Sequence, residues 1–287
     1  MDNTTKPLVA LMGAGGKMGC RLADNLRDHP GFAMRYLEVG EAGLARMREK
    51  GLSPTPAAEI LPEADIILLA VPDAKIGAIA AEVVPKVKSG AILMGLDPAA
   101  GYAEILPERE DITYFIAHPC HPPLFHEVYT EEAQTDWFGG YHAPQGVVCA
   151  LLQGPEEHYA VGEALAAAMY APVSRTHRLT VEQMALLEPG LVETTCATLI
   201  TAMREALDEV VKMGVPKEAA WDFTMGHIRI ELAILFDKAG FPFSDGAKLA
   251  VRNAQKRIFR DDWKEQTLSL ASVRQQVKEI VEADSAK

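Results

Sequence analysis

The chain has 287 residues, which is about the length of two average domains. Apolar residues make up 48% of it and charged residues 24%, so it can bury a large core and lacks the composition of a disordered protein. Its net charge is −12 and it contains no basic run, which argues against nucleic acid and anionic membranes as partners.

Cysteine usage and the first residues indicate where the protein works. Cys20, Cys120, Cys149 and Cys196 lie far apart and form no CxxC pair, so we expect neither a disulfide framework nor a structural zinc site. Residues 1–7 are polar and lead directly into an apolar run, unlike a signal peptide. No stretch reaches the roughly 18 uninterrupted apolar residues of a membrane span. We therefore expect a cytoplasmic protein with reduced thiols.

Strand and helix patterns alternate along the first part of the chain. Apolar runs predict strands at 8–12, 32–39, 65–71, 91–95 and 112–117, and helical spacing predicts helices at 17–27, 42–49 and 74–87. The run at 65–71 is almost wholly apolar, as in a strand that is covered on both faces. This alternation predicts an α/β fold with a doubly wound parallel sheet.

The remainder of the chain changes character twice. Residues 118–153 are irregular and rich in proline, glycine and histidine, with one further strand expected at 146–152. After Pro155 the pattern is helical, with helices expected at 156–170, from Thr180, and at 217–238, 244–259 and 263–283. Thr180 and Gln183 form a capping-box pattern, and Pro189 predicts a kink. We expect two domains, a sheet domain at 1–155 and an all-helical domain at 156–287.

A glycine-rich turn follows the first predicted strand and precedes the first predicted helix. Its residues are Gly13, Ala14, Gly15, Gly16, Lys17, Met18 and Gly19. Glycine permits a tight turn and close approach of the backbone, and a helix N-terminus offers free N–H groups to an anion. The spacing is not a strict GxGxxG, but a strand before it and a helix after it are the context that the motif needs. We expect these seven residues to bind the pyrophosphate of a dinucleotide, as in a Rossmann domain.

Two further positions point to the same cofactor. Glu38 ends the second predicted strand, where a carboxylate can accept hydrogen bonds from the adenosine ribose and repel a 2′-phosphate. It favours NAD over NADP, although Arg35 and Arg46 lie nearby; the alternative is an exposed strand end. The third predicted strand ends at Val71, Pro72 and Asp73, and a strand end at this place lies over the cofactor in a doubly wound sheet. The alternative is that these residues only form the turn that ends the strand.

The histidine-rich segment begins where the last parallel strand is expected to end. His118 lies at that edge, where the nicotinamide and substrate should meet, and can act as a general base or as a metal ligand. We expect His121, His126 and His142, taken singly, to have surface or structural roles.

Two carboxylates flank the proline of the predicted kinked helix. Glu188 precedes Pro189, and a kink can turn it inward to pair with His118 across the domain cleft around a divalent metal. An exposed glutamate at a bend is the alternative, and we prefer it for Glu193. Farther along, Lys248, Arg252 and Asn253 can contact an anionic substrate or form a solvated helix face.

These motifs resemble those of a known group of enzymes. GAGGKMG at 13–19, ADIILLAVPD at 64–73 and AHPCHPP at 117–123 resemble the 6-phosphogluconate and 3-hydroxyacid dehydrogenases, a group that includes prephenate dehydrogenase and ketol-acid reductoisomerase. The second half looks like the all-helical C-terminal domain of this group. It departs from the hydroxyacid dehydrogenases near 180–200, where EPGLVETT replaces their lysine-to-asparagine helix motif.

The combination of GAGGKMG, HPCHPPLF at 118–125 and LLEPGLVETT at 186–195 is more similar to the D-apionate oxidoisomerase family. This resemblance implies NAD-dependent oxidation of a branched sugar acid, coupled to its rearrangement. It also implies a divalent metal, with zinc as one candidate and with His118 and Glu188 as the matching catalytic and metal-binding residues. A metal-free NAD-dependent hydroxyacid dehydrogenase and a non-catalytic NAD-sensing protein remain as alternatives. The apolar helix face at 228–236 predicts a homodimer.

Overall fold

The computed structural model describes residues 6–125, 128 and 130–282, so His126 lies outside the described residues. The chain forms two compact units. The first contains Met1–Leu187 together with Arg274–Lys287, and the second contains Glu188–Val273.

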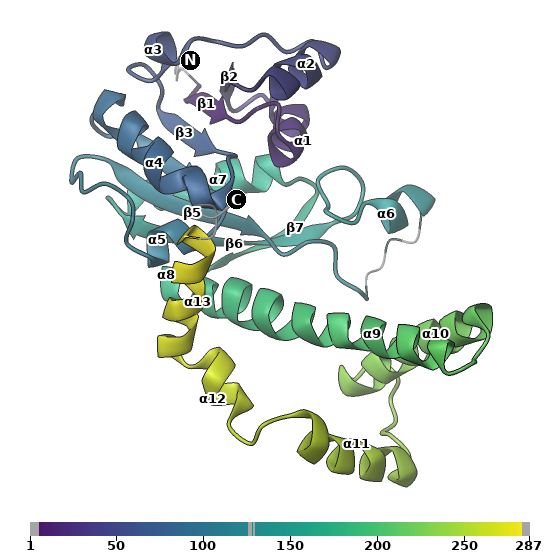
Figure 1. Ribbon diagram of the computed structural model, residues 1–287. Coiled ribbons are helices and arrows are strands. Elements are labelled where there is room, and N and C mark those ends of the chain that lie inside the picture. Colours follow the sequence, from purple (N-terminus) through teal and green to yellow (C-terminus); the bar gives the residue numbers. More distant parts are fainter. Residues whose placement is uncertain (1–5, 126–127, 129, 283–287) are drawn as a thin grey trace. The chain divides into compact units, whose positions relative to one another are not determined.

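A seven-stranded sheet forms the centre of the first unit, in the order β2-β1-β3-β4-β5-β6-β7 (Figure 1). The strands are β1 (Leu8–Met12), β2 (Ala33–Leu37), β3 (Ile66–Leu69), β4 (Ile92–Gly95), β5 (Thr113–Pro119), β6 (Gln145–Gln153) and β7 (Val173–Arg178). The first five are parallel, β6 is antiparallel to β5, and β7 is parallel to β6. The chain leaves β1 towards β2 on one side and returns to β3 on the other, so the sheet has a switch point between β1 and β3. Ligands of doubly wound sheets bind at such a point.

Helices cover both faces of this sheet. The first unit contains α1 (Lys17–Leu26), α2 (Glu41–Glu49), α3 (Ala57–Ile60), α4 (Asp73–Val83) with a 3-10 turn at Val84–Lys86, α5 (Ala99–Tyr102), α6 (Glu131–Thr135), α7 (Glu157–Met169), α8 (Val181–Ala185) and most of α13 (Leu270–Glu282). Side chains of β3 alternate between two buried clusters, because successive strand residues point to opposite faces. Leu68 packs in the cluster that contains Leu22 of α1 and Leu165 of α7, and Ile67 packs with Ile76 of α4. Figure 1 shows α4 in front of the sheet and α7 behind it. The predicted α/β architecture is therefore confirmed.

The first unit continues past residue 155, where we expected the sheet domain to end. Helix α7 packs against α1, β5 and β6, and strand β7 pairs with β6. These contacts hold residues 156–187 to the sheet, and the last part of α13 belongs to the same unit. Strand β7 was not predicted, because its sequence VSRTHR is polar and the burial of its side chains does not alternate along the strand.

The second unit is helical. It contains α9 (Thr198–Lys212), which packs against α10 (Lys217–Leu235), and α11 (Asp245–Ile258) and α12 (Trp263–Leu268).

The predicted capping box at Thr180 and Gln183 begins α8, and a π-helix (Leu186–Ala197) follows it. The sequence predicts a kink at Pro189, and this residue lies inside the π-helix, because proline lacks the N–H that an α-helix needs. Within the described residues, no helix combines the length and apolarity needed to cross a bilayer.

Candidate active site

The glycine turn joins β1 to α1 and has a backbone that only glycine fits. Gly13 has a φ of 75°, and a Cβ atom there would overlap the carbonyl oxygen of Ala70. A Cβ atom at Gly19 would overlap the carbonyl oxygen of Gly13, and one at Gly15 would overlap Gly43. The turn therefore allows β1, α1 and α2 to approach each other at backbone distance.

The turn is fixed at the switch point of the sheet. The N–H groups of Gly13 and Ala14 both donate to the carbonyl of Leu37, at 2.9 and 3.2 Å. Gly16 is the N-cap residue of α1 and brings no side chain to the helix N-terminus. Lys17 and Met18 form the first turn of that helix, whose N–H groups are suited to bind an anion. The strand, the close-packed glycines and the helix start form an arrangement suited to a pyrophosphate, and the role of the seven residues 13–19 in binding the cofactor stays a prediction.

Glu38 lies beside the glycine turn. Its Oε2 accepts a hydrogen bond from the N–H of Gly15 at 3.0 Å, and its Oε1 accepts from Val39 and Gly40 at 2.9 Å. A Cβ atom at Gly43 would overlap this carboxylate, so α2 approaches Glu38 only because it has glycine there. The carboxylate is therefore held in one orientation after β2.

A mainly apolar cavity of about 330 Å³ opens beside Glu38. Leu37, Val39, Ala57 and Val71 are among the residues that line it, together with Glu38. Such a cavity can hold a planar base whose ribose faces the carboxylate. Among the three residues predicted after the third strand, Val71 lines this cavity, whereas Pro72 and Asp73 are exposed at the start of α4.

The two arginines near Glu38 bind backbone oxygens. Arg46 donates through Nε to the carbonyl of Gly15 at 2.6 Å, and Arg35 donates to the carbonyl of Met34 at 2.8 Å. This hydrogen bond links the Arg46 side chain of α2 to the backbone of the glycine turn and helps to fix its conformation.

His118 lies on β5, where it pairs with Val148 of β6. Its Nδ1 is 2.8 Å from the carbonyl oxygen of Leu96, which follows β4. Because a carbonyl only accepts hydrogen bonds, Nδ1 carries the proton and the neutral ring keeps its lone pair on Nε2. This arrangement orients the imidazole for use as a base or as a metal ligand.

Asp97 is a site residue that the sequence analysis missed. Its Oδ2 lies 4.0 Å from Nδ1 of His118, and its Oδ1 accepts a hydrogen bond of 2.7 Å from the N–H of Ala99. Its side chain and that of His118 are 19% and 18% exposed, so solvent and ligands reach both. Asp97 lies two residues after the end of β4, and the carboxyl ends of parallel strands meet at one edge, so this position carried a usable signal.

Asp97, His118 and Glu188 each offer one ligand atom, and these atoms lie within 4.8 Å of one another. Glu188 is bonded to Leu187 and continues the helical run that begins with α8. Two carboxylates and an imidazole are a donor set suited to a divalent cation. The predicted role of His118 and Glu188 in metal binding and catalysis stays a prediction.

The other predicted positions differ in their surroundings. His121 contacts the segment around Phe138, and His142 is exposed. Glu193 is exposed in the π-helix, and Lys248, Arg252 and Asn253 are exposed on α11. Their expected roles stay predictions.

Comparisons with known proteins agree with this fold. Residues 126–281 match the family model for the C-terminal part of decarboxylating phosphogluconate dehydrogenase, and residues 4–133 match the NADPH-binding domain of acetohydroxy acid isomeroreductase. A D-apionate oxidoisomerase from Cupriavidus necator is 49% identical over 259 residues, which are 90% of this chain and 94% of the relative. One from Rhizobium rhizogenes is 49% identical over 258 residues, with the same shares covered.

The chain belongs to the D-apionate oxidoisomerase family. This confirms the resemblance carried by the glycine turn, the HPCHPPLF segment and the LLEPGLVETT segment. A crystal structure of a relative described as a semialdehyde dehydrogenase NAD-binding protein from Cupriavidus necator, in complex with calcium and NAD, superposes with a TM-score of 0.93. It is 46% identical and covers 96% of this chain and 100% of its own.

Proposed function

We propose that the chain oxidises D-apionate with NAD and rearranges the oxidised sugar acid to 3-oxo-isoapionate. Membership of the D-apionate oxidoisomerase family, over nine-tenths of the chain, is the observation that carries this proposal. Three features support it further. The glycine turn suits the pyrophosphate of the cofactor, the cavity beside Glu38 suits its adenosine, and His118 at the end of β5 suits the reacting groups.

NAD is the cofactor that the proposal assigns, rather than NADP. Glu38 presents a fixed carboxylate at the edge of the apolar cavity, where it suits two ribose hydroxyls and opposes a 2′-phosphate. Arg46, the nearby cation, is engaged with the carbonyl of Gly15. When bound, NAD accepts the hydride that leaves the substrate carbon.

A divalent metal fits the donor set of Asp97, His118 and Glu188. A cation held there would polarise the substrate carbonyl and the neighbouring hydroxyl, which favours migration of a carbon group. Zinc is one candidate, and the similar crystal structure from Cupriavidus necator holds calcium. In the alternative without a metal, His118 acts as a general base through Nε2.

Each residue of the proposed site would have a separate role in the reaction. The carbonyl of Leu96 fixes the ring of His118 and its tautomer, so that Nε2 faces the reacting groups. Asp97 adds negative charge near Nδ1, which favours a positive partner at this end of β4 and β5. Glu188 supplies the second carboxylate. In the oxidation the substrate loses a hydride and a hydroxyl proton. In the rearrangement one carbon–carbon bond breaks as another forms, and a proton passes between neighbouring oxygens.

The decisive experiment is a turnover assay that follows NADH with D-apionate and a panel of linear and branched sugar acids. Enzyme dialysed against a chelator is compared with the same enzyme after a divalent cation is added back. Metal-dependent NADH formation with D-apionate supports the proposal. Equal turnover without metal favours the metal-free dehydrogenase, and absence of turnover with every acid favours a non-catalytic NAD-binding role.

We also propose that the enzyme is a homodimer in the cytoplasm. Apolar side chains on α9 and α10 are unusually exposed, including Ile200 at 63% and Phe223 at 68%. Exposed apolar surface of this extent is typical of an interface, and a second copy supplies a matching face. The four free cysteines suit a reducing compartment. Light scattering on the purified chain tests the dimer, and a monomeric mass would contradict it.

A further inference from the structure

His121 has an unusual backbone conformation. Its φ is 58°, in the left-handed region of backbone conformation that residues other than glycine seldom adopt. It follows the end of β5 at Pro119, and its ring lies 6.3 Å from the ring of His118, edge to face. The turned backbone therefore accompanies a pair of neighbouring imidazoles. Backbone outliers of this kind concentrate at functional sites.

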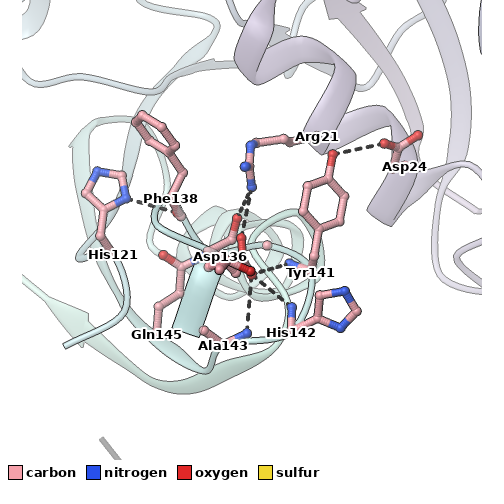
Figure 2. Close-up of polar contacts among 12 residues, drawn as sticks. Arg21, Asp24, His121, Asp136, Phe138, Tyr141, His142, Ala143 and Gln145 are labelled. Carbon is pink, nitrogen blue, oxygen red and sulfur yellow. Dashed lines mark hydrogen bonds and ion pairs between the residues drawn. The ribbon is translucent and has the colours of Figure 1, made fainter. Parts of the chain in front are cut away.

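The Nδ1 atom of His121, like that of His118, faces a backbone carbonyl oxygen. Its Nδ1 lies 3.0 Å from the carbonyl oxygen of Phe138, so Nδ1 donates and Nε2 keeps its lone pair. The Phe138 ring packs edge-on against the imidazole at 5.8 Å. Figure 2 shows the second ring nitrogen of His121 pointing away from the Phe138 segment. His121 thus uses Nδ1 for a backbone carbonyl and keeps Nε2 as an acceptor.

The segment that carries Phe138 is fixed by Asp136. The side chain of Asp136 is only 2% exposed, and its Oδ2 accepts hydrogen bonds from the N–H groups of Tyr141, His142 and Ala143 at 3.0, 2.9 and 3.2 Å (Figure 2). A buried carboxylate with three backbone donors closes the loop 136–143 on itself. The position of the Phe138 carbonyl is therefore determined by this loop.

Helix α1 holds the same loop from outside. Arg21 pairs with Asp136 at 3.3 Å and also donates to the carbonyl of Gly139. Asn25 donates to the carbonyl of Gly140 at 3.0 Å, and the ammonium of Lys17 lies 3.6 Å from the centre of the Phe138 ring. Because α1 starts at the glycine turn, the helix that would bind the cofactor also positions His121.

We propose that His121 binds the sugar acid, with Nε2 accepting a hydrogen bond from a substrate hydroxyl, and that Phe138, Asp136 and Arg21 position its ring. The inference rests on the proposed function, because it requires a polyhydroxy acid beside His118. It gives His121 a binding role in place of the surface or structural role expected from the sequence. A hydroxyl is the matching ligand because a neutral imidazole that donates through Nδ1 can only accept through Nε2.

Two substitutions separate substrate binding from a merely structural link to Phe138. His121→Asn keeps a donor near the position of Nδ1, and asparagine tolerates positive φ, so the link to Phe138 survives while the distal acceptor is lost. His121→Gln places an amide oxygen near the position of Nε2. We expect His121→Asn to raise the KM for the sugar acid by about ten- to hundredfold, and His121→Gln to raise it less. The affinity for NAD should not change in either variant.

The positioning role of Asp136 is tested in the same assay. Asp136→Asn should raise the KM for the sugar acid in the otherwise unchanged chain, but should not raise it further in the His121→Asn variant. His142→Gln is the matched control, since this histidine contacts Asp136 only through its backbone and its side chain is exposed. It should leave the KM unchanged.

Defined results would overturn the inference. An unchanged KM in His121→Asn would assign His121 to the structural link alone. Additive effects of Asp136→Asn and His121→Asn would show that Asp136 does not act through His121. A wild-type chain that oxidises no sugar acid would contradict the proposed function, and this inference with it, whereas normal wild-type turnover with unaffected variants would contradict the inference alone.

Discussion

His118 donates a hydrogen bond from Nδ1 to the carbonyl oxygen of Leu96, at 2.8 Å. This bond joins the ends of two neighbouring parallel strands, β4 and β5, and fixes which ring nitrogen faces the site. Asp97 follows Leu96 directly, so the same strand end supplies a carboxylate to the group that contains His118.

Removal of the imidazole should abolish the reaction without affecting the cofactor. His118→Ala should lower kcat by about 10²- to 10⁴-fold, because it removes the oriented Nε2 whether that atom acts as a base or as a ligand. Glu188→Ala should also lose activity. Isothermal titration calorimetry with NAD, or fluorescence titration with NADH, should give wild-type cofactor affinity in both variants. If either retains full turnover, the assignment of that residue to the site is wrong.

Cofactor choice should depend on Glu38. Glu38→Gln keeps one of the two acceptor oxygens, which can serve either Gly15 or the pair Val39 and Gly40, but removes the negative charge that would oppose a 2′-phosphate. The ratio of kcat/KM for NAD to that for NADP should fall by about tenfold or more. Steady-state kinetics with both cofactors measure this ratio, and an unchanged ratio would show that Glu38 does not discriminate.

The close packing of the glycine turn predicts a difference between two glycines. Gly19→Ala should abolish NAD binding or prevent folding, because its Cβ atom would overlap the carbonyl oxygen of Gly13. Gly226→Ala on α10 is the matched control, since its Cβ atom would meet no atom within 4 Å. Thermal melting and NAD titration of both variants test this. Equal behaviour of the two would contradict the proposed role of the turn.

The loop 136–143 should make stability depend on pH through Asp136. Burial raises the pKa of Asp136, but hydrogen bonds from the N–H groups of His142, Ala143 and Tyr141 and from Arg21 outweigh it and hold the pKa below its ordinary value. A lowered folded-state pKa stabilises the folded chain above the ordinary aspartate value of about 3.9, and this contribution is lost as the pH falls through the folded pKa.

Asp136→Asn should therefore destabilise the protein at neutral pH by about 1–3 kcal/mol. The difference in melting temperature between wild type and variant should be largest near pH 7 and should narrow below about pH 4. His142→Gln should melt like the wild type throughout. A gap that stays constant across this range would show that the charge of Asp136 does not stabilise the loop.

The sequence is most informative where structure is local. The strand, turn and helix around Gly13 and Gly19 follow from apolar periodicity and from glycines at close-packed positions. The capping box at Thr180 and the irregular helix at Pro189 likewise depend on neighbouring residues. These features could be predicted, and so could the parallel sheet, because alternating strands and helices allow few topologies.

Other features depend on contacts between distant residues. Strand β7 is polar and gains its conformation by pairing with β6, and α7 belongs to the sheet unit because it packs on α1 and β5. The contact between His121 and the carbonyl of Phe138 likewise joins residues that are 17 positions apart, and it exists only in the folded chain. No periodicity in the sequence carries that information.

The most direct test of the account is the identity of the product after complete conversion of D-apionate by the wild-type enzyme with NAD and a divalent cation. Carbon NMR of the mixture should show 3-oxo-isoapionate, formed in equal amount to NADH. An unrearranged oxo acid would show that the enzyme is a dehydrogenase without isomerase activity. Recovery of unchanged D-apionate without NADH would contradict the proposed function.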